Sequence, residues 1–135
     1  MADRIRDFKD LKVWQRSMDL MVGCYAVSRL FPREERYGLT SQLQRSSLSV
    51  PANIAEGNGR RHRREYIHHL SMAKGSVNEV ETLLIAATRL GYLPDEPRLE
   101  LTEMVDEVAR RLVALMRALD KDPPDSRFSR PIPPR

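Results

Sequence analysis

Apolar residues recur along this sequence at alternating steps of three and four, the spacing that keeps one face of an α-helix apolar. The first such stripe consists of Val13, Ser17, Leu20, Cys24, Val27 and Phe31. A second stripe beside it makes this face broad, and its members are Trp14, Met18, Met21 and Tyr25. Pro32 is expected to end the helix, because proline in a helix interior breaks the hydrogen-bond pattern.

A second helix is predicted from about residue 37 to residue 58. Its apolar positions are Leu39, Leu43, Val50 and Ile54, flanked by Leu48, Ala52 and Ala55. Pro51 lies inside this pattern and predicts a kink, because it removes one backbone donor and crowds the preceding turn. We expect the helix to end at Gly57-Asn58-Gly59, where a glycine can adopt the left-handed capping conformation.

Two further stripes predict a third helix that ends at Leu90 and a fourth that begins at about Asp95. The third stripe consists of Leu70, Ala73, Val77, Val80, Leu84 and Ala87, and the fourth of Leu101, Val105, Val108, Leu112, Leu115 and Leu119. Gly91 is the expected C-terminal cap of the third helix, and Pro94 prevents that helix from continuing. Asp95 is the expected N-terminal cap of the fourth.

Four amphipathic helices with short connections predict an all-α fold, an antiparallel four-helix bundle of up-down-up-down topology. The composition agrees, because 31% of the residues are charged and only 6% are aromatic, which favours helices over a β-sandwich. We expect an N-terminal arm at 1–10, the bundle at 11–119 and a proline-rich flexible tail at 120–135. The tail is interpreted either as a solvated extension or as a peptide ligand centred on residues 131–134.

The single cysteine, Cys24, excludes an intramolecular disulfide bond and a CxxC motif. No apolar run reaches the roughly 18 residues of a membrane-spanning helix, and the start Met1-Ala2-Asp3-Arg4 is too polar for a signal peptide. These features predict a cytoplasmic protein.

The net charge of +4 is concentrated in one stretch of the chain. Residues 45–74 contain six basic and two acidic residues, so this stretch alone has an excess of four positive charges. Because the whole chain has 23 basic and 19 acidic residues, 17 of each sign remain outside the stretch and cancel. Four of the six basic residues belong to the run Arg60-Arg61-His62-Arg63-Arg64, between the second and third predicted helices.

This arginine run is the sharpest functional feature of the sequence. Guanidinium groups present planar pairs of donors that match phosphate oxygens, so the run predicts contact with RNA or DNA. The candidate nucleic-acid-binding residues are Arg60, Arg61, Arg63, Arg64 and Lys74. The alternative is a solvated turn whose charges serve solubility.

A polar stripe on the second predicted helix has a structural interpretation. Its members are Gln42, Arg45, Ser49, Asn53 and Glu56. In a hairpin centred near Arg61, Arg45 lies opposite Asn78 or Glu79, and Asn53 lies opposite His69. We therefore expect a buried polar network that fixes helix register, made of Arg45, Asn53, Glu56, Asn78 and Glu79.

The pair Gly75-Ser76, in the middle of the third predicted helix, weakens that helix. It predicts close approach of a neighbouring helix, with a ligand notch as the alternative.

Neither a metal site nor a catalytic site is predicted. His68 and His69 are adjacent and point in different directions, and the Glu65–His68 spacing lacks the second copy that a di-iron bundle needs. The serines at 46, 47 and 49 have no recognisable base and orienting group. We therefore expect no metal, no cofactor, no small-molecule substrate and no enzymatic activity.

Several motifs between residues 8 and 119 resemble, in the right order, those of a known family. They are Phe8-Lys9-Asp10-Leu11-Lys12-Val13-Trp14-Gln15, Tyr37-Gly38-Leu39 followed by Gln42, Val50-Pro51-Ala52-Asn53-Ile54-Ala55-Glu56-Gly57, Ala73-Lys74-Gly75-Ser76-Val77-Asn78-Glu79 and Gly91-Tyr92-Leu93. The chain is similar to four-helix-bundle proteins encoded in intervening sequences of bacterial large-subunit (23S) ribosomal RNA genes. The resemblance implies a four-helix bundle, often a homopentamer, whose molecular role is not established and whose genomic setting suggests RNA. A more distant resemblance is to the basic, pentameric accessory protein of diversity-generating retroelements.

Two functions follow as hypotheses. The leading one is a non-catalytic, homo-oligomeric bundle, a pentamer by family resemblance, that binds RNA or DNA phosphates through its basic interhelix loop. The rival is a protein-interaction scaffold without a nucleic-acid role. Its partner docks on the ring of copies or takes the proline-rich tail. The broad apolar face of the first helix motivates this hypothesis, because it is wider than one helix seam requires.

Overall fold

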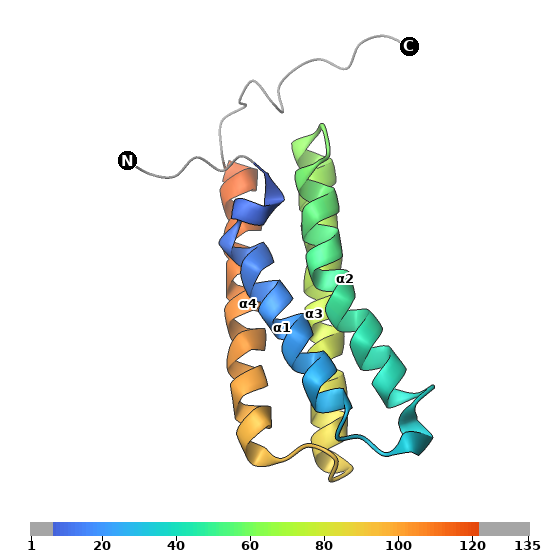
Figure 1. Cartoon of the computed structure of the whole chain (residues 1–135). Coiled ribbons are helices and arrows are strands. Elements are labelled where there is room, and N and C mark those ends of the chain that lie inside the picture. The colour runs from blue at the N-terminus through green and yellow to red at the C-terminus, as the bar shows by residue number, and fades with distance from the viewer. Residues whose placement is uncertain (1–6, 122–135) are drawn as a thin grey trace.

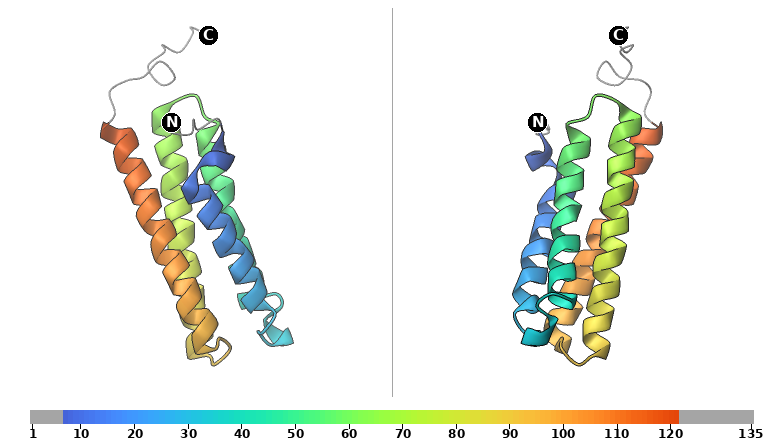
Figure 2. Two further views of the ribbon diagram at one scale, coloured as in Figure 1. Left: turned by 60° about the vertical axis from the view of Figure 1, so that its left-hand side comes forward. Right: turned by 90° about the vertical axis from the view of Figure 1, so that its right-hand side faces the viewer.

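The structure of this 135-residue chain is a computed structural model, and it describes residues 7–121. Its elements in chain order are the 3₁₀ turn η1 (Phe8–Asp10), α1 (Lys12–Ser28), the 3₁₀ turn η2 (Arg33–Glu35), α2 (Leu39–Asn58), α3 (Arg63–Arg89) and α4 (Asp95–Lys121). Helices α1 and α3 each pack against both α2 and α4. Consecutive helices run in opposite directions (Figures 1 and 2). The predicted up-down-up-down antiparallel four-helix bundle is confirmed.

The core consists of the apolar stripes read from the sequence. Every member of the stripe on α1, and every member of the stripe on α3, is buried. The stripe on α4 is buried except at Leu115, which is half-buried. On α2 the flanking residue Leu48 instead lies on the outside, with 47% of its surface exposed. The 3.6-residue period of the helix therefore explains which side chains are buried. It does not account for Leu48, on the outer flank of α2.

The helix ends follow the predicted positions more closely than the predicted conformations. Helix α2 ends at Asn58 as expected, but Gly59 has φ −80°, so the expected left-handed cap there is wrong. Gly91 does have positive φ, at 80°. The Tyr92 N–H donates to the Ala87 carbonyl at 2.9 Å, and the Gly91 N–H donates to Thr88 at 3.0 Å. These two bonds form a Schellman motif and satisfy carbonyls at the end of α3.

Proline acts at three places in the bundle. Helix α1 ends at Ser28, short of Pro32, which instead precedes η2. Figure 1 shows that α2 bends about halfway along its length, and Pro51 lies near that midpoint in the sequence. The Pro94 carbonyl accepts the Arg98 N–H at 3.1 Å, so Asp95 is the first residue of α4 and not its cap.

Both expected end segments lie mostly outside the described residues. Helix α4 extends to Lys121, two residues past the expected end of the bundle, and the rest of the expected tail falls at 122–135. At the other end, residues 1–6 of the expected arm are outside the description. The Phe8 ring packs edge-on against Trp14, with 5.3 Å between ring centroids.

Close approach of α2 and α3 depends on Gly57, not on Gly75. A Cβ atom added at Gly57 would lie 2.7 Å from the His69 Cβ and 3.2 Å from the Tyr66 carbonyl oxygen. A Cβ added at Gly75 meets nothing within 4 Å in the part of the chain that the structure describes. The expectation of close helix approach at Gly75-Ser76 is therefore wrong for Gly75, which faces outward, whereas the Ser76 hydroxyl does meet Ser49 of α2.

The two glycines predict stability changes of opposite sign. Gly75→Ala should stabilise the protein by roughly 0.5–1 kcal/mol, because alanine restricts the unfolded chain and favours a helix. Gly57→Ala should destabilise it by about 1–3 kcal/mol, because the methyl group forces α2 and α3 apart. Chemical denaturation of both variants checks the pair. Equal effects at the two positions would contradict the assignment of the contact to Gly57.

Candidate nucleic-acid interface

The predicted arginine cluster lies at one end of the bundle, where α2 passes into α3 (Figure 1). Residues 60–64 are called the arginine turn below. The connection itself is shorter than the sequence suggested, because α3 begins at Arg63. Arg60 and Arg61 precede the helix, whereas Arg63 and Arg64 occupy its first turn. The cluster is thus a tight turn followed by a helix start, and not a continuous loop.

Most of the arginine turn is exposed. Arg60, Arg61 and Arg64 are exposed, and Arg63 is half-buried. Arg60 donates to the Glu56 carboxylate, with 2.7 Å between Nη2 and Oε1. An exposed ion pair of this kind contributes little to stability and leaves further guanidinium N–H donors pointing to solvent. Glu56, together with Glu65 in the first turn of α3, offsets only part of the positive charge at this end.

The start of α3 adds to that charge. His62 precedes the helix with extended backbone, and its side chain makes no capping hydrogen bond. The first N–H groups of a helix have no partner within the helix, and the helix dipole places partial positive charge there. The arginine turn therefore combines side-chain charge with the polarity of a helix N-terminus.

Lys74 lies apart from the arginine turn, about three turns further along α3. Its Nζ donates to Asn78 Oδ1 at 2.8 Å. It borders a surface groove of about 400 Å³ between α3 and α4, whose other lining residues are Ala109, Arg110, Val113, Ala114 and Arg117. Sequence reasoning missed Arg110 and Arg117, because the acids in the first half of α4 cancel them in a count along the chain. Their spacing of seven residues, two helical turns, was the available signal.

The predicted polar network exists in part. The Asn53 Oδ1 lies 3.3 Å from the His69 Nδ1, which confirms their expected juxtaposition. Glu56 approaches the same imidazole nitrogen at 4.0 Å. One turn further into the bundle, the Ser49 hydroxyl donates to the Ser76 hydroxyl. The network that links α2 to α3 therefore runs through serines and His69.

Arg45, Asn78 and Glu79 are not part of this network, so their predicted inclusion is wrong. All three are exposed. Arg45 donates to Ser41 Oγ within its own helix, at 3.3 Å, and Asn78 accepts from Lys74. The hairpin register was right, but these side chains rotate outward from the line where α2 and α3 meet.

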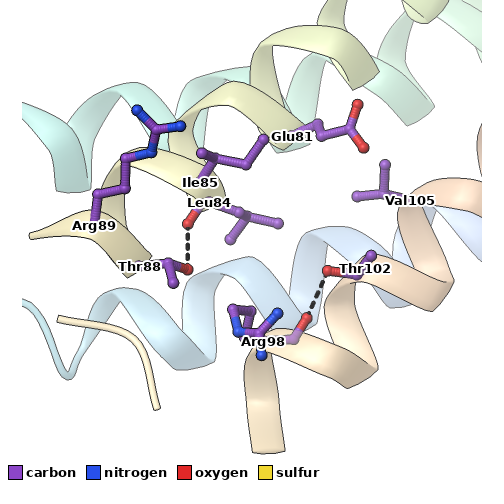
Figure 3. Close-up of a pocket in the computed structure, with 8 residues that line it drawn as sticks. All are labelled: Glu81, Leu84, Ile85, Thr88, Arg89, Arg98, Thr102 and Val105. Atoms are coloured by element: carbon purple, nitrogen blue, oxygen red, sulfur yellow. Dashed lines mark hydrogen bonds between the residues drawn. The ribbon is translucent and has the colours of Figure 1, made fainter. Parts of the chain in front are cut away.

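A second cavity of about 360 Å³ lies at the opposite end of the α3–α4 pair (Figure 3). Its lining combines Leu84, Ile85 and Val105 with groups of both charges, including Glu81, Arg89 and Arg98. Figure 3 shows the hydroxyls of Thr88 and Thr102 turned to carbonyls of their own helices. Among the described residues, Arg98 Nε is buried without a hydrogen-bond partner. The lining of this cavity thus contains charges of both signs, whereas the lining of the groove beside Lys74 contains only basic ones.

Cys24 does not offer a reactive thiolate. Burial raises the pKa of its thiol to about 12, against a smaller lowering by the Ser47 hydroxyl. Within residues 7–121, no group of three or more His, Cys, Asp and Glu side chains is placed to hold a metal ion. None of the described helices combines the length and the apolarity needed to span a membrane.

Comparisons with known proteins give a family and a fold. Residues 9–114 match the family described as 23S rRNA-intervening sequence protein. A crystal structure of a protein of unknown function from the S23 ribosomal protein family of Bacteroides thetaiotaomicron matches with a TM-score of 0.72 and 24% sequence identity. The match covers 78% of this chain and 98% of that chain, and at this identity it supports the fold alone. No curated protein matches the sequence.

The polar network yields a paired prediction. Asn53→Ala should destabilise the protein by about 1 kcal/mol, because it removes the partner of a buried imidazole. Asn78→Ala should change stability by less than about 0.5 kcal/mol, because the bond to Lys74 is exposed. Urea titrations of both variants measure the difference. Equal losses would show that burial of the Asn53–His69 pair has no special importance.

Proposed function

The chain belongs to the 23S rRNA-intervening sequence protein family, and on that premise we propose a non-catalytic, homo-oligomeric, cytoplasmic bundle that binds RNA or DNA phosphates through the arginine turn. The observation that carries this proposal is the group of exposed arginines at one end of the bundle, only partly offset by Glu56 and Glu65. Arginine forks match phosphate oxygens, and such contacts are largely independent of base sequence.

Self-association is supported by an apolar face that the bundle leaves open. On α1 the side chains of Trp14, Met18, Met21 and Tyr25 are only half-buried. Val22 lies beside them with 60% of its surface exposed. A second copy of the chain that covers this face removes apolar surface from water. A closed ring of copies also repeats the arginine turn, which raises the effective affinity for a polyanion.

The alternative function is a protein-interaction scaffold without a nucleic-acid role. The same open face of α1 favours it, because a different protein can cover apolar surface as well as a second copy can. The two functions differ in what the arginine turn does, so nucleic-acid binding separates them.

Nucleic-acid binding is tested by titrating labelled RNA at about 50 and 200 mM salt. The variant Arg60→Ala/Arg61→Ala/Arg63→Ala/Arg64→Ala should bind more weakly than wild type and show a salt slope flatter by about three, because phosphate contacts are lost. The matched control is Arg29→Ala/Arg33→Ala/Arg36→Ala/Arg89→Ala, which removes four exposed arginines at the other end. Equal affinity of wild type and the arginine-turn variant contradicts the proposal, and favours the scaffold.

Assembly is tested by light scattering. The family resemblance predicts a mass of five times the 15.6 kDa of one chain. Val22→Lys should lower the assembled mass, whereas Leu99→Lys, which changes an equally exposed leucine on α4, should not. A wild-type mass of 15.6 kDa at all concentrations refutes self-association.

A further inference from the structure

The groove beside Lys74 is basic on both walls. Lys74 stands on α3, and Arg110 and Arg117 stand on α4, with Ala109, Val113 and Ala114 between them. Arg110 and Arg117 are exposed. The residues that line this groove include no acid and no aromatic ring. Its free volume of about 400 Å³ therefore lies between three cations over a floor of small apolar side chains.

This basic groove lies in one half of the α3–α4 pair, and the two halves of that pair have opposite net charge. The half of α3 and α4 nearest the arginine turn, residues 63–78 and 108–121, contains seven basic and two acidic residues. The far half, residues 79–89 and 95–107, contains two basic and eight acidic residues. Because α3 and α4 are antiparallel neighbours, the two basic stretches lie side by side (Figure 2). The change of sign falls just beyond Arg110.

The cavity in the far half of the same helix pair shows the contrast. It is similar in size, but Glu81 lines it together with Arg89 and Arg98, and Arg98 is paired with Asp95 at 3.3 Å. Arg111, which follows the groove residue Arg110 in the sequence, likewise forms an ion pair with Glu107, with 2.9 Å between Nε and Oε2. Hydrogen bonding from Arg111, aided by Arg16, keeps the pKa of Glu107 below its ordinary value, so this carboxylate stays charged at neutral pH. By contrast, Arg110 and Arg117 line the groove that Lys74 borders, and no acidic residue lines that groove.

We propose that the basic groove is a second phosphate-binding surface, which carries the backbone of the nucleic acid from the arginine turn along α3 and α4 to the level of Arg110. This inference rests on the proposed function and deepens it. From Arg64 to Lys74 the path is about 15 Å long at 1.5 Å per residue, which matches roughly four base-pair steps of 3.4 Å measured along the axis of a duplex. The acids beyond Arg110 repel phosphate and end the path there.

The lining also defines the kind of contact. Proteins that grip single strands through their bases use aromatic stacking platforms, and the lining of this groove has none. The guanidinium groups of two arginines and the ammonium group of one lysine instead provide hydrogen-bond donors for phosphate oxygens. Binding in the groove is therefore to the backbone, with little dependence on base sequence.

The test compares three variants of the full chain by fluorescence titration with a 20-nucleotide RNA, single-stranded and as a duplex, and with the matching DNA. The groove variant is Lys74→Gln/Arg110→Gln/Arg117→Gln. Its control, Arg29→Gln/Arg33→Gln/Arg89→Gln, removes the same charge from exposed positions at the opposite end of the bundle. The third variant, Asp106→Asn, removes the acid one turn before Arg110. Circular dichroism melts establish that all three fold.

The groove variant should bind at least about tenfold more weakly than the control at 50 mM salt, with a salt slope flatter by about two to three. Asp106→Asn should bind about twofold more tightly than wild type, because one repulsive charge is gone. Equal affinities of the groove variant and its control overturn the inference.

The outcomes also separate this inference from the proposed function. Loss of binding in the arginine-turn variant but not in the groove variant leaves the proposed function intact and refutes the groove. Loss in the groove variant alone supports the groove and refutes the arginine turn as the main contact. Absence of binding by wild type refutes both. Displacement of the RNA by polyglutamate at equal charge shows that the groove takes an acidic protein segment, which overturns the assignment to nucleic acid.

Discussion

The structure depends on burying four apolar stripes at once, one from each helix. Each helix contributes a leucine that is fully buried: Leu20, Leu43, Leu70 and Leu112. Each such side chain contributes roughly 1.5–3 kcal/mol relative to an exposed position. Small polar residues are buried among the stripes, and the hydroxyls of Ser17 and Ser47 donate to carbonyls of their own helices. Close packing is thus possible without leaving these buried hydroxyls unsatisfied.

This constraint also decides where charge can go. Since the stripes must face one another, charged residues are left to the outer faces and the ends. The antiparallel topology then brings the last turn of α2, the first turn of α3 and the last turns of α4 to the same end. Basic residues that are far apart in the sequence, such as Arg64 and Arg117, become parts of one basic region. The opposite half of α4 is acidic, and its Glu107 forms an ion pair with Arg16 of α1, with 2.9 Å between Oε2 and Nε.

The sequence was informative wherever a single helix or a single hairpin determined the answer. The stripes, the Schellman motif at Gly91 and the juxtaposition of Asn53 with His69 needed only helical periodicity and the register of α2 against α3. Predictions from the sequence failed where they depended on how far each helix is rotated about its own axis, or on the position of a third helix. Whether Gly57 or Gly75 meets a neighbour, and whether Arg45 turns inward or outward, depends on the exact rotation of each helix. The basic groove needs two helices that a charge count along the chain treats separately.

The placement of the arginines is not explained by helix stability alone. Basic residues near the end of α4 and acidic ones near its start do favour the helix dipole, but that effect fades within one turn of each terminus. Arg110 lies about three turns from the end of α4, beyond its reach. At the start of α3 the dipole favours Glu65 but acts against Arg63 and Arg64, which share that first turn. Positive charge there costs a few tenths of a kcal/mol or more per residue. Solubility needs charge on the surface, but it does not need positive charge at an unfavourable helix end. A bound anion resolves the conflict, since it is attracted by the helix terminus and the arginines together.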